Sequence, residues 1–129
     1  MDYFRGVVHQ KDVSRRVLGL TQAIIEQNPG HYMVWQYRCR VLEALCTASN
    51  AASDPASDPA DKEEALWASE IAFLNLILQE HPKGYQGWHH REYVMRRCRQ
   101  HQNEKRFLME MLMDDAKNYH CWAYRSRCF

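Results

Sequence analysis

The sequence predicts an all-α fold built from antiparallel helical hairpins, and three observations support this prediction. The motif Tyr-x-x-Trp-x-x-Arg occurs three times, starting at Tyr32, Tyr85 and Tyr119. Its three named positions fall along one face of a helix. Each copy follows an apolar pair of residues and then a short polar break. No segment alternates with a period of two for long enough to form a strand, so helix, turn and helix repeat along the chain.

Seven helices are expected in order, over residues 2–9, 13–27, 32–46, 62–80, 85–101, 104–114 and 119–129. Apolar residues at helical spacing support the second and fourth helices. The two stripes consist of Val13, Val17, Leu20 and Ile24, and of Leu66, Phe73 and Ile77. Pro29 and Pro82 mark the ends of these two helices, because the residue before a proline is disfavoured in helical geometry.

The spacing of the motif copies indicates an insertion. Tyr85 and Tyr119 lie 34 residues apart, whereas Tyr32 and Tyr85 lie 53 apart. The excess matches a low-complexity stretch with two consecutive copies of Ser-Asp-Pro-Ala at residues 53–60. We therefore predict a single solenoid domain over residues 1–129 with a disordered loop at 47–61. A plain solvated loop is favoured over one that is phosphorylated or binds a partner.

Composition and charge narrow the class of protein. The chain has 129 residues, 46% of them hydrophobic and 12% aromatic, which is ample for a globular core. A formal net charge of +1 gives no case for nucleic acid or an anionic membrane as the main partner. No apolar run approaches the ~20 residues that a spanning helix requires. The first residues also lack the basic head and apolar core of a signal peptide, so we expect a cytoplasmic protein without membrane insertion.

The cysteines do not suggest a metal site. Their number, five, is odd, and they lie inside the predicted helices. Cys39 and Cys46 are seven residues apart, as are Cys121 and Cys128, which is about 10 Å along a helix. That separation is too long for two bonds to one ion, and the chain has no Cys-x-x-Cys. We expect buried small hydrophobic residues and no zinc site in this chain.

The motif residues themselves are expected to be structural. One helical hairpin has no complete core and buries its faces on its neighbours. The three tryptophans then act as equivalent wedges between the helices of each hairpin, and each arginine stacks on an aromatic ring or bonds carbonyls of the preceding turn. These residues are Trp35 and Arg38, Trp88 and Arg91, and Trp122 and Arg125.

The motif and its preceding turns resemble the repeat of protein prenyltransferase alpha subunits. The resemblance covers nearly all of the chain and is greatest to the alpha subunit shared by protein farnesyltransferase and geranylgeranyltransferase type I. It is strongest at MDYFR, PKGYQGWHHR and DAKNYHCW, at residues 1–5, 82–91 and 115–122. The Rab geranylgeranyltransferase alpha subunit is a less similar alternative. A tetratricopeptide-like interaction protein shares the 34-residue period but orders its Trp, Gly and Tyr differently.

This resemblance implies a fold, partners and an activity. The alpha subunit would be a right-handed superhelical solenoid, a crescent wrapped around a beta subunit that holds the catalytic zinc, with magnesium as a further candidate ion. The heterodimer would transfer a farnesyl or geranylgeranyl group from its diphosphate to the cysteine of a C-terminal CaaX protein. The isolated chain would be inactive. Members of the family carry further repeats, so we expect the chain to be part of a longer alpha subunit.

The resemblance also assigns site residues. It places Lys83 at the isoprenoid diphosphate as the catalytic contribution of the chain, and Tyr85, Lys117, Tyr119 and His120 beside the substrate. An ammonium group aimed at the charge that develops on the leaving diphosphate would lower the barrier, and helix N-termini favour anions. Solvated turn lysines are the alternative for both lysines. His89 and His90 point about 100° apart on a helix, so we interpret them as packing and interface residues.

Overall fold

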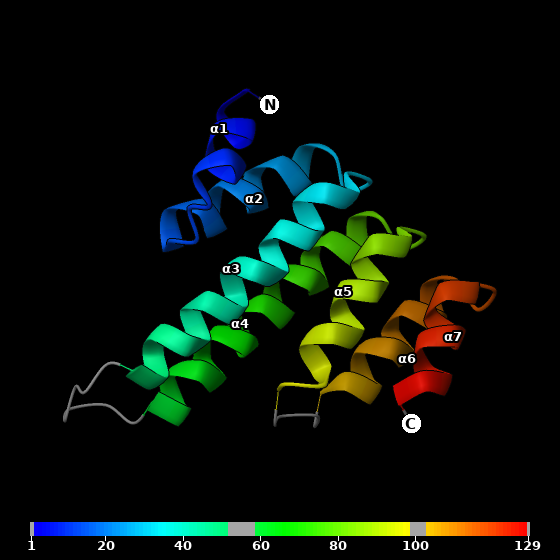
Figure 1. The fold of residues 1–129 in the computed structure, drawn as a ribbon. Coiled ribbons are helices and arrows are strands. Elements are labelled where there is room, and N and C mark those ends of the chain that lie inside the picture. The colour runs from blue at the N-terminus through cyan, green and yellow to red at the C-terminus, as the bar shows by residue number, and fades with distance from the viewer. Residues whose placement is uncertain (1, 52–58, 99–102, 129) are drawn as a thin grey trace. The chain divides into compact units, whose positions relative to one another are not determined.

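The computed structural model describes residues 2–51, 59–98 and 103–128, and within these ranges it contains helices and no strands (Figure 1). The all-α prediction is thus confirmed. The helices are α1 Asp2–Gln10, α2 Arg15–Gln27, α3 Tyr32–Ala51, α4 Pro59–Glu80, α5 Tyr85–Met95, α6 Glu104–Asp114 and α7 Tyr119–Cys128. None of the described helices has the length and apolar character needed to cross a membrane.

The chain divides into two compact units, residues 1–63 and 64–129. Unit 1 contains α1 to α3 and the beginning of α4, and unit 2 contains the rest of α4 with α5 to α7. A single right-handed solenoid over residues 1–129 therefore stays a prediction.

Unit 1 is built on the hairpin of α2 and α3. Its core consists of fully buried side chains from both helices: Val17, Thr21, Ile25, Val34, Val41 and Leu42. Helix α1 covers this hairpin with Phe4, whose ring meets Tyr37 edge-on at 5.8 Å between centroids. The Tyr37 hydroxyl donates to the Asp12 carbonyl at 2.5 Å. These contacts bind the segment before α2 to the first half of α3.

Unit 2 contains two hairpins. Helices α4 and α5 run antiparallel, because Gly87 lies against Leu78 while the later His90 lies against the earlier Glu70. Helices α6 and α7 form the next hairpin. Helices α5 and α7 run in the same direction side by side, so the turns before them lie at the same end of the unit (Figure 1). This parallel arrangement is what a repeat of hairpins produces.

Several helix ends differ from those predicted. Helix α3 continues to Ala51 and α4 begins at Pro59, so the predicted disordered loop at 47–61 is wrong at both of its ends. Residues 47–51 include two alanines, the best helix former, and proline is tolerated in the first helical turn. The central part of the predicted loop, residues 52–58, lies outside the described residues.

The fifth helix is also shorter than predicted. It ends at Met95 instead of continuing toward residue 101. The Arg97 N–H bonds the Val94 carbonyl, three residues back, which tightens the backbone into a turn. Residues 99–102 lie outside the described residues. Helix α2 starts at Arg15 rather than 13, since Ser14 adopts the extended conformation of an N-cap.

Candidate functional site

The tryptophan of each motif closes the turn that precedes it. All three indole N–H groups donate to the carbonyl six residues earlier, at 2.7, 2.8 and 2.7 Å. The donor and acceptor pairs are Trp35 with Pro29, Trp88 with Pro82, and Trp122 with Ala116. The recurring aromatic residue therefore fixes the geometry of these turns. Trp35 and Trp88 are buried, but Trp122 is 44% exposed, so the prediction of three equivalent wedges is wrong for Trp122.

The motif arginines occupy three different environments. Arg38 is buried and donates to the Leu18 carbonyl at 2.8 Å. Arg91 is buried between α4 and α6, and donates to Glu104 at 2.7 Å and to Asn75 at 2.9 Å. Arg125 is exposed, with its guanidinium 5.6 Å from the Trp122 ring. Arg38 thus bonds a carbonyl, Arg91 bonds a carboxylate and a side-chain amide, and Arg125 contacts an aromatic ring.

The turn before α5 presents Lys83. This turn spans residues 81–84, and the Gly84 N–H closes it by donating to the His81 carbonyl at 3.0 Å. The Lys83 side chain is exposed. Gly84 is the N-cap of α5, so the free N–H groups of the first helical turn follow the lysine directly. Tyr85, the first helical residue, is 55% exposed.

The turn before α7 presents Lys117 in the same manner. The Asp115 side chain accepts from the Lys117 N–H at 3.0 Å. Asn118 caps α7, because its Oδ1 accepts from the Cys121 N–H at 3.3 Å. The Lys117 side chain is exposed, and Tyr119 after it is 74% exposed. Both lysines thus lie beside the N-terminus of a helix, where the helix dipole favours an anion.

One hydrogen bond joins the two turns. Asn118 Nδ2 donates to the Pro82 carbonyl at 2.8 Å, and the indole of Trp88 donates to the same oxygen at 2.8 Å. Asn118 is only 1% exposed. The lysine-bearing segments at 81–84 and 115–118 are therefore held side by side, although they are separated by about one repeat in the sequence.

Aromatic rings extend this surface along the two helix starts. The Tyr85 ring lies 4.9 Å from His89 and 6.5 Å from His120, measured between centroids. The Tyr119 ring lies 5.7 Å from His120. The structure thus brings the predicted residues Tyr85, Tyr119 and His120 together and adds His89. We call Lys83, Lys117 and these four ring residues the rim site.

The histidine pair that follows Trp88 is divided between surface and core. His89 is exposed, whereas His90 is 4% exposed and lies 2.8 Å from the Glu70 carboxylate. A buried carboxylate and imidazole in contact stabilise each other only as a pair. His90 is therefore part of the α4–α5 packing, and His89 alone reaches the rim site.

The described residues include no cluster of three or more His, Cys, Asp or Glu side chains placed to hold a metal ion. No disulfide bond joins any of the five cysteines, all of which lie within the described residues. Burial raises the pKa of the Cys121 thiol, and the pKa of Cys128 is also raised by burial. Since metals and electrophiles react with the thiolate, these two residues behave as small apolar side chains at neutral pH.

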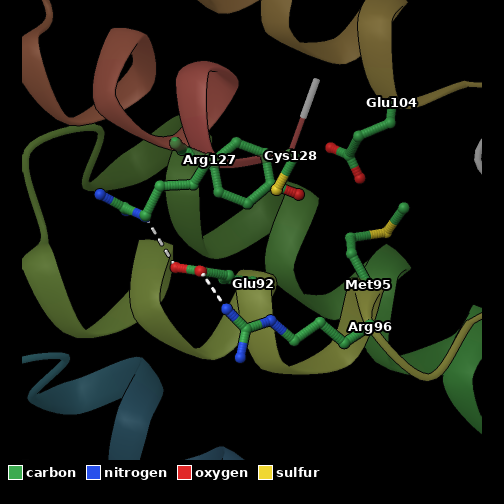
Figure 2. Close-up of a pocket in the computed structure, with 7 residues that line it drawn as sticks. Glu92, Met95, Arg96, Glu104, Arg127 and Cys128 are labelled. Atoms are coloured by element: carbon green, nitrogen blue, oxygen red, sulfur yellow. Dashed lines mark hydrogen bonds and ion pairs between the residues drawn. The ribbon is translucent and has the colours of Figure 1, made fainter.

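A cavity of about 270 Å³ lies at the other end of α5 and α7 (Figure 2). Figure 2 shows Glu92 at its edge between Arg96 and Arg127, each 2.8 Å away. Glu104 also lines the cavity and accepts from Arg91. Tyr85 and Arg96 are eleven residues apart, about 16 Å along a helix. The cavity is thus separate from the rim site, and its carboxylates already have cationic partners.

Sequence reasoning missed Asn118 and the rim position of His89. An Asn directly before a helix is an N-cap signal, so the cap itself was detectable. The bond from Asn118 to Pro82 was not, because it joins residues that come together only when one hairpin packs on the next. The sequence predicts packing and interface roles for both His89 and His90, and no local signal distinguishes the two.

Comparison with known families and proteins agrees with this geometry. The model of the protein prenyltransferase alpha subunit repeat matches residues 14–45, 67–98 and 101–129. These three segments contain the three hairpin turns and their Trp-closed helices.

Individual relatives include both classes of prenyltransferase subunit. The chain is 28% identical over 121 residues to the geranylgeranyl transferase type-2 subunit alpha of Saccharomyces cerevisiae, covering 90% of the chain and 33% of the relative. It is 31% identical over 116 residues to the rat type-2 subunit alpha, covering 88% of the chain and 19% of the relative. It is 33% identical over 104 residues to the protein farnesyltransferase/geranylgeranyltransferase type-1 subunit alpha of Schizosaccharomyces pombe, covering 81% of the chain and 29% of the relative.

The fold has a solved counterpart. The Candida albicans protein geranylgeranyltransferase-I, solved in complex with GGPP, superposes with a TM-score of 0.69 at 24% identity. The superposition covers 93% of this chain and 36% of that one. The chain therefore spans about a third or less of the length of these relatives. With a repeat model matching three times over most of its length, the chain belongs to the family of protein prenyltransferase alpha subunit repeats.

Proposed function

We propose that this chain contributes the diphosphate-facing turns of a protein prenyltransferase alpha subunit. The observation that carries the proposal is the bond from Asn118 to the Pro82 carbonyl. It holds two exposed lysines, each beside a helix N-terminus, on one surface of unit 2. Two ammonium groups and two sets of free N–H groups suit a ligand with several negative oxygens, such as a diphosphate.

The chemistry of prenyl transfer gives this surface a role. Transfer of the prenyl carbon to a cysteine thiolate breaks the bond to the diphosphate oxygen and leaves additional charge on the diphosphate. An ammonium group that meets this charge stabilises the transition state more than the bound substrate. Lys83 has this role in our proposal. Lys117, Tyr85, Tyr119 and His120 line the same substrate.

The remaining parts of the enzyme would come from a beta subunit. We propose that it supplies the zinc that activates the acceptor thiol, any magnesium, and most of the lipid and peptide pocket. The family membership of the chain supports this partner, and no residue of the chain is assigned to a metal. The heterodimer would act in the cytoplasm.

Two acceptor classes are in competition. We favour the alpha subunit shared by farnesyltransferase and geranylgeranyltransferase type I, acting on CaaX proteins, since the fission yeast type-1 subunit is 33% identical. The alternative is the Rab geranylgeranyltransferase subunit, supported by the type-2 relatives at 28% and 31% identity. Assays of the heterodimer with a CaaX peptide and with a Rab protein, each with farnesyl and geranylgeranyl diphosphate, separate the two.

Substitution of Lys83 tests the catalytic role. In the full-length alpha subunit co-expressed with a beta subunit, we expect Lys83→Ala to lower kcat by about 100- to 1,000-fold, the range for loss of one group that stabilises developing charge. Heterodimer formation should be unchanged, because the Lys83 side chain is exposed. Arg106→Ala, which removes an exposed cation of α6 outside the rim site, is the matched control and should retain full activity.

Two results would contradict the proposal in different ways. A heterodimer that forms and turns over normally with Lys83→Ala would leave a scaffold role and remove the catalytic one. Absence of prenyl transfer with any beta subunit would instead favour a non-enzymatic helical-repeat interaction protein.

A further inference from the structure

We infer that Asn118 is a positioning residue, which sets the lysine-bearing turn before α5 against the lysine-bearing turn before α7. Its structural effect is read from unit 2 alone. Its effect on turnover rests on the proposed function. Neither the sequence pattern nor the family resemblance assigns a role to this residue.

The environment of Asn118 leaves its side chain one arrangement. The residue is 1% exposed. Its Oδ1 accepts from the Cys121 N–H, which caps α7, while its Nδ2 donates across to the Pro82 carbonyl. Its backbone N–H also bonds the Asp115 carbonyl at 3.2 Å. Cap, turn and bridge thus depend on one buried amide, and a buried amide is costly to leave unpaired.

The bridge acts directly beside both lysines. The Pro82 carbonyl belongs to the peptide group that joins Pro82 to Lys83, and Asn118 directly follows Lys117. The same carbonyl accepts from the Trp88 indole, so its two acceptor positions are both used. The backbone direction at Lys83 is therefore fixed from inside its own hairpin by Trp88 and from the next hairpin by Asn118.

The other two hairpin turns have no asparagine at the position of Asn118. The corresponding positions hold His31 and Gly84, and the turn of unit 1 has Gly30 where the later turns have lysine. Asparagine thus occurs in the turn that brings a second lysine against a first. A purely capping role would not require the amide, because Ser or Asp caps a helix about as well.

A substitution that keeps the cap and removes the bridge tests this inference. Asn118→Ser retains an oxygen for the Cys121 N–H, but its side chain is too short to reach the Pro82 carbonyl. In the full-length heterodimer we expect kcat to fall about 10- to 100-fold, since a displacement of about 1 Å in a catalytic group has effects of this size. KM for the prenyl diphosphate should change by less than about 3-fold, because ground-state binding is shared with other residues.

A double-mutant cycle identifies the group through which Asn118 acts. If it positions Lys83, then adding Asn118→Ser to Lys83→Ala lowers kcat no further than Lys83→Ala alone. If the double variant instead loses kcat by the product of the two single effects, the inference is overturned. Leu108→Val, a buried change in α6, is the stability control and should lower Tm without changing kcat. Equal losses of kcat in Leu108→Val and Asn118→Ser at matched Tm would also overturn it.

Hydrogen exchange gives a readout that does not depend on catalysis. Amides of residues 81–85 should exchange faster in Asn118→Ser and not in Leu108→Val, while those of residues 28–32 in unit 1 stay unchanged. Unchanged exchange at 81–85 would refute the bridge. If Asn118→Ser fails to fold, Asn118→Asp keeps a stronger cap, lacks the donor and gives the same readouts. Normal turnover of Lys83→Ala would refute the proposed function, while the exchange data would still decide on the bridge.

Discussion

One position of the repeat is buried in all three copies but has different surroundings in each. Tyr37, His90 and Tyr124 all stand five residues after the first Tyr of the motif, and all are buried. Tyr37 donates to the Asp12 carbonyl and His90 lies against Glu70. The Tyr124 hydroxyl finds no hydrogen-bond partner within the described residues. The position is buried in all three copies of the motif, but the partners of Tyr37 and His90 come from segments distant in the chain.

Buried Tyr124 predicts sensitivity to alkaline pH. Burial raises the pKa of its hydroxyl above the ordinary value, as it does for the Cys121 thiol. Unfolded chains release these protons at about pH 8.5 for Cys and 10 for Tyr, whereas the folded protein retains them. The unfolded state then binds fewer protons than the folded state. The contribution of these two groups to the free energy of unfolding is therefore complete at neutral pH and decreases as the pH rises through this range.

The change Tyr124→Phe should reduce the decrease in the free energy of unfolding at alkaline pH. Urea unfolding of the chain between pH 7 and pH 11 measures the slope of stability against pH. We expect a smaller slope above about pH 10 in Tyr124→Phe. Tyr119→Phe is the control, because that side chain is 74% exposed and its removal should leave the slope unchanged. An identical slope in Tyr124→Phe would exclude a contribution from the buried hydroxyl.

Among the helices, two glycines have opposite surroundings. A Cβ at Gly87 in α5 would lie 2.9 Å from Leu78 Cδ2 on α4, and Leu78 is fully buried. A Cβ at Gly19 in α2 would meet nothing within 4 Å. By helix propensity alone, a glycine inside a helix is destabilising relative to alanine. The structure shows that Gly87 permits close contact between the two helices of its hairpin.

Replacement of each glycine by alanine should therefore have different results. Gly19→Ala should raise the free energy of unfolding by about 0.4–1 kcal/mol, because alanine has the higher helix propensity and restricts the unfolded chain. Gly87→Ala gains the same propensity but must displace Leu78, and we expect no net stabilisation. Denaturant unfolding of both variants measures the difference. Equal stabilisation would show that Leu78 moves aside freely.

For the molecule as a whole, the buried arginines hold each unit together from within. Arg38 ties α3 to α2 in unit 1. Arg91 ties α5 to α4 and α6 in unit 2, with its guanidinium 3.7 Å from the Phe107 ring centroid. The two residues occupy the same motif position and stabilise different units.

Loss of either arginine should open its own unit first. Arg91→Ala leaves the Glu104 carboxylate buried without its cation, a change that costs about 3–5 kcal/mol. Arg38→Ala removes bonds to a carbonyl and a hydroxyl, at about 1–3 kcal/mol. Hydrogen exchange should rise in α4 to α7 for Arg91→Ala and in α2 and α3 for Arg38→Ala. Exposed Arg125→Ala, the control, should stay within about 0.5 kcal/mol of the parent. Equal exchange in both units would contradict this division.

The helices and the residues of the candidate site were largely readable from the sequence. Periodicity, prolines and the repeated motif are local signals, so they predict helix existence and the turns that carry Lys83 and Lys117. Helix ends were less predictable at residues 47–61 and 96–101, where alanine-rich and charged segments are compatible with both helix and loop. The resemblance added Tyr85, Tyr119 and His120, which lie together in the structure.

The sequence by itself determined the hairpin, its period and the chemical groups at each turn, because these depend on residues within about one repeat of each other. Only the tertiary structure decided which groups meet. The Asn118 bridge to Pro82 joins two neighbouring turns, while the Arg91 pair with Glu104 and the approach of Leu78 to Gly87 join neighbouring helices. Such contacts depend on the offset and spacing between packed helices, and that geometry is set by side-chain volumes on both faces at once rather than by any local pattern.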